Sequence, residues 1–420
     1  MVSSTEALAA SLEVKKHISF NLRCLRMLPQ PYTSADDQRM TLGYFALSSL
    51  DLLYGLDKIP TEEKQELVDW IYDQQSPSGG FGGSPSNSFH ASCCSAGASR
   101  HSTEVGSASI KQKKRGMVGN VAMTYAALVS LSILRDSFQR LNRSALIEFI
   151  SALQDKTNGG FAAEIPKKPY QSQLVDRDPR FSYCAIAICS MLGEWGEVDI
   201  GKAKIYVQGC QRYDGGFGAS EWHESHSGMG YCCVAALHLL GVSSGGSKEW
   251  KRREEAITWL AHRQVGSSQS PPLSQHGSST EGSKNGEITE GRDREEEEQE
   301  EEEEEKMTGG FQGRPNKLPP DVCYSFWNGG ALAILGEHDL VDAKLDAGYV
   351  LSAQSKVGGI SKMPDEHPDL LHTYLGLASL SLHQPDGEGQ GIEFGMKRLD
   401  AVLNCSLEAK RWILKHLTKS

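Results

Sequence analysis

Segments that are apolar on nearly every side alternate along this chain with segments that are apolar on one side and charged on the other. The run FSYCAIAICSML from Phe181 is of the first kind, and EEKQELVDWIYDQQ over residues 62–75 is of the second. A helix that is apolar all round has to be surrounded by other elements, whereas an amphipathic helix covers such a core from outside. The pattern predicts inner helices that begin near Thr41, Asn120, Phe181, Gly230, Cys323 and His372.

A short turn motif recurs between the two kinds of segment. Two glycines followed by Phe or Ile begin at Gly79, Gly159, Gly215, Gly309 and Gly358, and four of the motifs closely follow a glutamine: Gln75, Gln154, Gln211 or Gln354. Self-similarity at roughly 50 residues is typical of repeat architectures, in which stacked units bury a face that no unit buries alone. We therefore expect an all-α fold, an α/α toroid of six helical hairpins with inner and outer helices around a central apolar cavity.

Two segments interrupt this repeat and lengthen its spacing. Residues 84–115 are rich in Ser and Gly, residues 265–306 are rich in Ser, Gly and Glu, and both are poor in apolar side chains. Such segments bury too little surface to offset the entropy lost on ordering. The sequence therefore predicts a single domain over residues 1–420 with two disordered insertions.

The charge and the cysteines of the chain indicate which partners and which cellular compartment to expect. The formal charge is −11, and residues 287–305 alone carry 13 acidic residues against two arginines, so the rest of the chain is nearly neutral. A nucleic-acid partner is therefore not expected. Adjacent cysteines such as Cys93 and Cys94 are poor candidates for a disulfide, and neither a signal peptide nor a transmembrane segment is recognised. A cytoplasmic protein with reduced thiols is the expectation.

The openings of the inner helices carry a set of polar side chains. Helix N-termini offer free N–H groups and the positive end of the helix dipole, so a ring of them favours anions. A single His or Cys in such a helix is more often a packing residue, but equivalent positions in several repeats are harder to explain in that way. The residues are Arg180, His226, Arg314, Lys317, Asp321, Cys323 and His372.

Three of these side chains form a candidate metal site. Asp321, Cys323 and His372 offer a carboxylate, a thiolate and an imidazole, all of which zinc accepts, and they leave a fourth tetrahedral position open. An open position is typical of catalytic sites. A substrate thiol bound there would become a thiolate at neutral pH.

Four blocks of sequence carry a resemblance to a known family. The blocks are GGFQGRPNKLPPDVCYSFW, ESHSGMGYC, RFSYC and DLLHTY. Together they resemble the beta subunits of protein prenyltransferases, most closely those of geranylgeranyltransferase type I, and the similarity covers nearly the whole chain outside the insertions. The resemblance implies an α/α toroid, a zinc ion, an isoprenoid diphosphate and lipid transfer to a cysteine near the C-terminus of an acceptor protein. It also implies a heterodimer with an alpha subunit.

The resemblance also assigns roles to individual residues. Asp321, Cys323 and His372 match the zinc ligands, and with Lys317 and Tyr324 they are the residues expected to be catalytic. Arg180 matches an arginine near the carboxylate of the acceptor, and Trp327 matches an aromatic side chain of the lipid-lined wall. The residues that match the diphosphate-binding set are His226, Arg314, Lys317 and Tyr324.

Four further positions indicate which lipid and which ions are used. The similar farnesyltransferases have large aromatic side chains where this chain has Thr41 and Leu371, so a deeper cavity that takes the longer geranylgeranyl chain is expected, with Phe45 in the same wall. Lys362 stands where the farnesyl and Rab-type relatives have an aspartate associated with magnesium. An ammonium group near the diphosphate neutralises the same charge, so magnesium is not expected to be required.

These residues lead to a specific expectation with several alternatives. The chain is expected to be the catalytic beta subunit of a zinc-dependent enzyme that moves geranylgeranyl from its diphosphate to the cysteine of a C-terminal CaaX motif. By resemblance the last acceptor residue is usually leucine, and the acceptors are small GTPases of the Rho type. The alternatives are a Rab-type or farnesyl beta subunit, a terpene cyclase on a similar toroid, and a non-catalytic scaffold.

Overall fold

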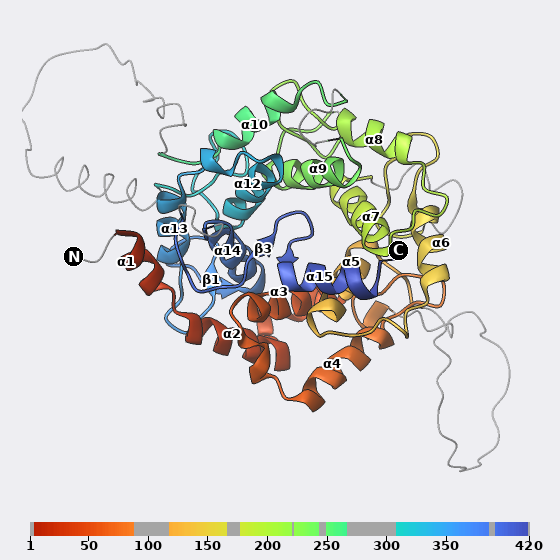
Figure 1. Ribbon diagram of the computed structural model, residues 1–420, viewed down its shortest axis with the longest axis horizontal. Helices are drawn as coiled ribbons and strands as arrows, with labels where there is room; N and C mark the ends of the chain where they lie inside the picture. The colour runs from red at the N-terminus through yellow and green to blue at the C-terminus, as the bar shows by residue number, and fades with distance from the viewer. Residues whose placement is uncertain are drawn as a thin grey trace, which may run out of the picture.

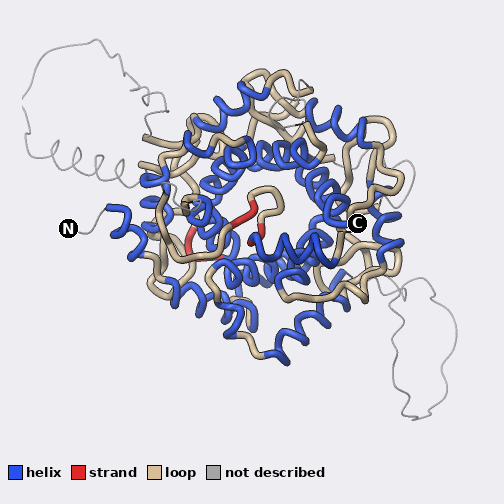
Figure 2. The backbone as a smooth tube through the Cα atoms, in the orientation of Figure 1, coloured by secondary structure: helices blue, strands red, loops and turns tan. Residues whose placement is uncertain are grey.

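The inner helices of the chain form a closed ring inside a second ring of helices (Figures 1 and 2). The computed structural model describes residues 4–87, 117–165, 177–220, 222–242, 249–266, 308–385 and 391–418. Within this part, the inner ring consists of α3 (Arg39–Leu52), α5 (Val121–Ile133), α7 (Pro179–Leu192), α9 (Ser227–Leu239), α12 (Val322–Leu335) and α14 (Leu370–Leu382). Each inner helix contacts the next, and α14 contacts α3. The predicted α/α toroid is confirmed.

The inner helices are buried because their side chains are apolar or small on all sides. In α5, 11 of the 13 residues are buried, and the small side chains of Ala126, Ala127 and Ser130 are among them. Each inner helix begins within three residues of the predicted start. Five helices begin one to three residues early, because the first turn precedes the apolar run that made the helix recognisable, whereas α5 begins one residue late because Asn120 is its N-cap.

The outer ring consists of helices of 9 to 13 residues with one exposed side. Its members, each paired with the inner helix that follows it, are α2 (Val14–Arg26), α4 (Thr61–Asp73), α6 (Arg143–Leu153), α8 (Ile200–Gly209), α10 (Arg253–Ala261) and α13 (Ala343–Ser352). A further helix, α1 (Ser4–Ser11), contacts α13. Short 3-10 helices occur at η1 (Gln30–Gln38), η2 (Gly55–Lys58), η3 (Pro85–Asn87) and η5 (His338–Leu340).

The glycine turns fasten each hairpin to the outer helix of the next. Gly309 has a φ of +96°, and a Cβ added to it would lie 2.3 Å from the carbonyl oxygen of Leu345 in α13. At Gly358 the same Cβ would lie 2.1 Å from the carbonyl oxygen of Lys16 in α2. No side chain fits at either place, so the last turn packs directly against the first outer helix and closes the outer ring.

The glutamine of the fourth turn was missed in the sequence pattern. Gln264 forms the bridge to Phe311 that the other turns form with their own glutamines. Its amide Nε2 donates to the carbonyl of Gly309 at 3.1 Å and to that of Asp342 at 3.0 Å. The second insertion separates Gln264 from Gly309 in sequence, so the motif is continuous in space but not along the chain.

The end of the ring opposite the helix N-termini is covered by the C-terminal part of the chain. Residues 397–406, which we call the C-terminal plug, contain the paired strands β3 (Leu399–Asp400) and β4 (Cys405–Ser406). Helix α15 (Leu407–His416) follows, and both lie across the ring in Figure 1. A second small antiparallel pair, β1 (Ile360–Ser361) with β2 (Pro368–Asp369), leads into α14. These four strands of two residues each are an addition to the predicted all-α fold.

The structure also bears on the predictions about membrane spans, cysteines and insertions. No helix in the described ranges is long and apolar enough to cross a membrane. The eight cysteines in those ranges are all buried and free, including the adjacent pair Cys232 and Cys233. Residues 88–115 and 267–306 of the predicted insertions lie outside the described residues. Ser84 is buried and its hydroxyl donates to Asp36 at 3.2 Å, so the ordered chain continues a few residues past the predicted boundary.

Candidate functional site

Capping side chains gather the functional residues at one end of the ring. An N-cap side chain accepts a hydrogen bond from a free N–H of the first helical turn, which fixes both the helix start and the position of the cap. His226 caps α9, with Nδ1 accepting from the N–H of Gly228 at 3.0 Å. Asp321 caps α12 and Asp369 caps α14. The N-termini of neighbouring inner helices lie together, so these side chains converge at an open end that we call the mouth.

Asp321, Cys323 and His372 meet at the mouth as predicted. One ligand atom of each lies within 4.8 Å of the others, and all three side chains are largely buried. The His372 Nε2 atom is 3.1 Å from Asp321 Oδ1. Two ligands of a tetrahedral zinc ion lie about 3.3 Å apart, so this separation suits a shared metal. The group is a candidate metal site built from two neighbouring inner helices, α12 and α14.

Asp369 is a functional residue that the sequence analysis missed. Its Oδ1 accepts from the N–H of His372 at 2.9 Å, and its Oδ2 is 2.5 Å from His372 Nδ1. Metal-binding histidines commonly donate their second ring N–H to a carboxylate, which fixes the tautomer and aims the other nitrogen at the metal. An aspartate three residues before a histidine at the start of a helix is the sequence signal for this arrangement.

The protonation of the cluster also suits a cation. Burial alone raises the pKa of Asp321, but hydrogen bonds from His372 and Cys323 outweigh it and hold the pKa below its ordinary value. Burial alone lowers the pKa of His372, but Asp321 and Asp369 raise it to about 9. Burial and the neighbouring Asp321 raise the pKa of the Cys323 thiol well above its usual value. The cluster therefore holds positive charge on His372, which a metal ion would replace.

His226 and Tyr324 form a second polar pair beside the cluster. The His226 Nε2 atom is 3.1 Å from the Tyr324 hydroxyl, and the rings meet edge to face with centroids 5.4 Å apart. Burial and the charges of Arg314, Arg180 and Lys317 lower the pKa of His226 to about 4, so the ring is neutral near pH 7. Nδ1 accepts from a main-chain N–H, so Nε2 carries the proton and donates to the tyrosine oxygen. The Tyr324 O–H is then left to donate to a ligand.

The predicted cations lie around this pair and differ in how they are held. Arg314 forms an ion pair with Glu224 at 3.2 Å, whereas Lys317 is exposed. Arg180 is bound by both oxygens of Asp178, at 3.0 and 2.7 Å. The sequence analysis did not identify these two carboxylates. They hold the arginines in place and neutralise part of their charge.

Lys362 is placed beside the metal cluster by its main chain. Its carbonyl accepts a hydrogen bond from the N–H of Val322, the first residue of α12, at 2.8 Å. Val322 lies between Asp321 and Cys323 in sequence, so the backbone of Lys362 is fixed next to two of the three candidate ligands. Its side chain is exposed.

The residues predicted to line a lipid cavity lie in the first two turns of their helices, with Leu371 directly before His372. Thr41 and Phe45 on α3 and Leu371 on α14 are half-buried, and these two helices are in contact. Phe45 packs against Tyr374, three residues after Leu371, with ring centroids 5.9 Å apart. Trp327 is also half-buried and packs against Tyr231 at 5.0 Å.

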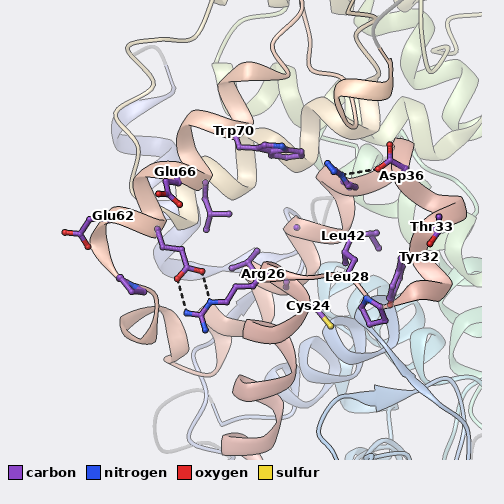
Figure 3. A pocket seen from close by; sticks show the side chains of 18 residues that line it. Cys24, Arg26, Leu28, Tyr32, Thr33, Asp36, Leu42, Glu62, Glu66 and Trp70 are labelled. Atoms are coloured by element: carbon purple, nitrogen blue, oxygen red, sulfur yellow. Dashed lines mark hydrogen bonds and ion pairs between the residues drawn. The ribbon is translucent and has the colours of Figure 1, made fainter.

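A cavity of about 1050 Å³ opens elsewhere, on the outside of the ring among α2, η1, α3 and α4 (Figure 3). Its wall combines apolar side chains such as Leu42 and Trp70 with the acidic Glu62. Arg26 is paired with Glu63 at 2.9 Å, as the dashed lines in Figure 3 show. None of the predicted site residues lines this cavity, so we assign the functional site to the mouth, where those residues gather.

Comparisons with known proteins agree with this geometry. A model of the prenyltransferase alpha-alpha toroid domain matches residues 12–405. The chain is 30% identical over 397 residues to the geranylgeranyl transferase type-1 subunit beta of Arabidopsis thaliana, covering 90% of this chain and 87% of that protein. It is 29% identical over 388 residues to the subunit of the same name from Dictyostelium discoideum, covering 89% and 92%.

A solved structure shares the fold. The Candida albicans protein geranylgeranyltransferase-I complexed with GGPP aligns with a TM-score of 0.74 and 24% identity, covering 97% of this chain and 100% of that chain. The chain therefore belongs to the prenyltransferase alpha-alpha toroid family. Within that family its relatives place it among the geranylgeranyl transferase type-1 beta subunits, which are protein prenyltransferases, and the resemblance found in the sequence is confirmed.

Proposed function

We propose that this subunit, paired with an alpha subunit, transfers geranylgeranyl from its diphosphate to the cysteine of a C-terminal CaaX motif. The observation that carries the proposal is the group of Asp321, Cys323 and His372, whose ligand atoms lie within 4.8 Å of one another beside a set of cations. A metal position next to a cationic mouth suits a reaction in which a thiolate attacks while an anion leaves.

We infer that zinc is the metal. The donor set of one carboxylate, one thiol and one imidazole is of the kind zinc accepts, and it leaves one tetrahedral position open. Asp369 fixes the tautomer of His372 so that Nε2 faces Asp321. A zinc ion held by these residues would lower the pKa of an acceptor thiol and supply a thiolate nucleophile near pH 7.

The diphosphate is assigned to the polar pair and the cations. Tyr324 keeps its hydroxyl proton for a phosphate oxygen because His226 donates to the tyrosine oxygen. Arg314 and Lys317 supply positive charge, and both already act electrostatically on His226. As the bond from C1 to the diphosphate breaks, these donors stabilise the charge that develops on the leaving group.

Lys362 is proposed to take the place of magnesium. Its backbone is fixed at the first residue of α12, beside the cluster, while its side chain is exposed at the mouth. An ammonium group there neutralises part of the diphosphate charge but does not ligate magnesium. Transfer is therefore expected to proceed without added magnesium.

The lipid is assigned to the half-buried residues below the mouth. Thr41, Phe45 and Leu371 are proposed to bound the far end of the chain, and Trp327 to line the wall nearer the metal. Five carbons more than in a farnesyl chain contribute roughly 4 kcal/mol when buried, as an upper bound. Thr41 and Leu371, which are smaller than the aromatic side chains of farnesyltransferases at these positions, therefore favour the longer lipid.

The acceptor is proposed to be a small GTPase of the Rho type whose CaaX motif usually ends in leucine. Arg180 is the candidate for its terminal carboxylate, and the pairing with Asp178 would hold the guanidinium in position. Work in the cytoplasm is consistent with the eight free, buried thiols of the described residues. The alpha subunit is proposed to complete the site at the mouth.

The proposal is tested on the purified heterodimer with geranylgeranyl and farnesyl diphosphates and a CaaX peptide ending in leucine. We expect thioether formation with a higher kcat/KM for the C20 lipid, loss of transfer with a zinc chelator, and recovery when zinc is restored. Added magnesium should leave turnover unchanged. Transfer that persists in zinc-free protein would contradict the assigned chemistry, and a preference for the C15 lipid would contradict the roles of Thr41 and Leu371.

A further inference from the structure

The loop of the C-terminal plug is held from five directions inside the inner ring. Figure 2 shows this part of the chain in the centre of the ring. Tyrosine hydroxyls donate hydrogen bonds to its successive main-chain carbonyls. The pairs are Tyr231 to Ala401 (2.8 Å), Tyr183 to Val402 (2.8 Å), Tyr125 to Leu403 (2.6 Å), and Tyr44 and Tyr374 both to Asn404 (2.7 and 2.6 Å). Each tyrosine belongs to a different inner helix.

These tyrosines occupy equivalent positions in the repeats. Four of them are the fifth residue of their helix, and the fifth residue of α12 is Phe326, which has no hydroxyl to donate. Neighbouring rings lie with centroids 5.0 to 6.0 Å apart, from Tyr374 through Tyr44 and the others to Phe326. A layer of aromatic rings therefore crosses the ring one turn below the mouth, and the plug supports it from the other side.

The two aromatic rings beneath Phe45, those of Tyr44 and Tyr374, are hydrogen-bonded to one residue of the plug, Asn404. Phe45 rests on Tyr44 and Tyr374, with centroids 5.3 and 5.9 Å away. Both tyrosines donate to the carbonyl of Asn404, and Tyr374 also lies 3.0 Å from Asn404 Oδ1. Asn404 is buried and has a φ of +41°, a left-handed conformation that asparagine adopts more readily than most residues.

We propose that Asn404, held by Tyr44 and Tyr374, fixes the depth of the lipid cavity beneath Phe45 and thereby sets the longest prenyl chain that the enzyme accepts. This inference rests on the proposed function, because it assumes that Phe45 bounds the lipid. Asn404 and the two tyrosines act through Phe45, so they are positioning residues.

The physical basis is the cost of moving a buried main-chain group. While both hydroxyls are bound to the Asn404 carbonyl, the loop cannot shift without breaking two buried hydrogen bonds and leaving that carbonyl without these donors. If both hydroxyls are removed, the Asn404 carbonyl has no bond to either tyrosine, so moving the loop no longer breaks these two hydrogen bonds. Residue 404 is then free to withdraw, although Tyr125, Tyr183 and Tyr231 still hold the rest of the loop, and Phe45 can follow the two rings downward.

The test compares two variants that remove the same kind of hydrogen bond from the same loop. The heterodimer with Tyr44→Phe and Tyr374→Phe loses the bonds beneath Phe45. The matched control is Tyr183→Phe, which frees Val402 on the opposite side of the ring. The kcat/KM of each is measured with geranylgeranyl (C20) and geranylfarnesyl (C25) diphosphates, and the C20-to-C25 ratio is compared with the wild type.

We expect the ratio to fall about tenfold in the double variant, as burial of one or two further methylene groups would give, and to stay within about twofold in the control. An unchanged ratio in an active double variant, or an equal fall in Tyr183→Phe, would overturn the inference. If the double variant does not fold, Tyr44→Phe and Tyr374→Phe are measured separately, and each removes one of the two bonds to the Asn404 carbonyl. A smaller fall of the ratio in both supports the inference, and an unchanged ratio in both overturns it. Absence of C20 transfer by the wild type would instead overturn the proposed function.

Discussion

The two ends of the inner ring are built from the same helices but differ in how they use polar side chains. At the mouth, helix N-termini are capped by His226, Asp321 and Asp369, and exposed cations such as Lys317 and Lys362 stand around them. At the opposite end, the C-terminal plug and α15 cover the helix C-termini. At that end, which we call the closed end, the acidic side chains of Asp51 and Asp400 form ion pairs with lysines of the same chain.

The contrast is clearest for the buried charge at the closed end. Asp51 is fully buried at the end of α3, with Lys397 Nζ 2.6 Å from its Oδ1 and the Ser406 hydroxyl 2.5 Å from its Oδ2. Lys410 is paired with Asp400 in the same way at 2.5 Å. These polar groups at the closed end bind other groups of the same chain, whereas exposed cations at the mouth such as Lys317 are available to bind a ligand. The comparison therefore predicts that stability and chemistry can be perturbed separately.

The largest expected effect is on stability at the closed end. Asp51→Ala removes the partner of Lys397 and the acceptor for Ser406 in a buried site, which should lower the free energy of unfolding by roughly 3 kcal/mol. Urea unfolding and calorimetry of the heterodimer measure this loss. Zinc stoichiometry and C20 transfer by the folded protein should remain at the wild-type level, because neither group touches the mouth.

The matched control for this change is Asp57→Ala in the nearby η2. Asp57 pairs with Lys58 at 3.6 Å, but both side chains are mostly exposed. A surface pair of this kind contributes about 0 to 1 kcal/mol, so the control should be nearly as stable as the wild type. If Asp51→Ala released zinc while the protein stayed folded, the two ends would not be separable in the sense argued here.

The sequence predicted the elements that depend on local pattern. The inner helices follow from continuous apolar runs such as that of α5, and the glycine turns follow from a repeated motif. The three candidate ligands were also predicted, because their residue types point to a metal. Gln264 was missed because the second insertion separates it from Gly309, and hydrogen-bond partners of this kind are recognisable only once the chain is folded.

The supporting carboxylates were harder to predict for a related reason. The spacing of Asp369 and His372 is a sequence signal, but an ordinary helix cap has the same residue type, and only the second Asp369 oxygen on His372 shows the added role. Glu224 is a common surface-type residue, and its pairing with Arg314 depends on the packing of neighbouring hairpins. Asp178 lies two residues before Arg180 and, in sequence, looks like an ordinary helix cap. The tyrosine bonds to the plug are non-local, since they join it to helices 30 to 360 residues away in sequence.

A smaller effect is expected at the mouth from the carboxylate behind His372. Asp369→Asn keeps a side-chain oxygen for the cap but weakens the hold on His372 Nδ1. Loss of such a partner lowers metal affinity about 10- to 100-fold, so zinc should be released at correspondingly lower chelator concentrations. The midpoint of unfolding with zinc removed should change little.

The control for that change is Asp365→Asn in the loop between β1 and β2. Asp365 is exposed and has a φ of +66°, a conformation that asparagine also adopts readily. The same chemical change should leave zinc affinity unaltered. Equal weakening by both variants would show that charge near the mouth, and not the orientation of His372, governs metal binding.

The smallest expected effect concerns Lys362, the exposed cation proposed to take the place of magnesium. Lys362→Ala removes one solvent-exposed charge worth about 1 kcal/mol, so kcat should fall about fivefold while KM for the acceptor peptide is unchanged. Lys356→Ala is the matched control, because Lys356 is equally exposed but lies in the glycine turn on the outer ring. Rates are measured at saturating zinc with and without magnesium. Wild-type turnover that rises strongly with magnesium, or an equal loss in the control, would mean that Lys362 does not act on the diphosphate and that the mouth relies on a second ion.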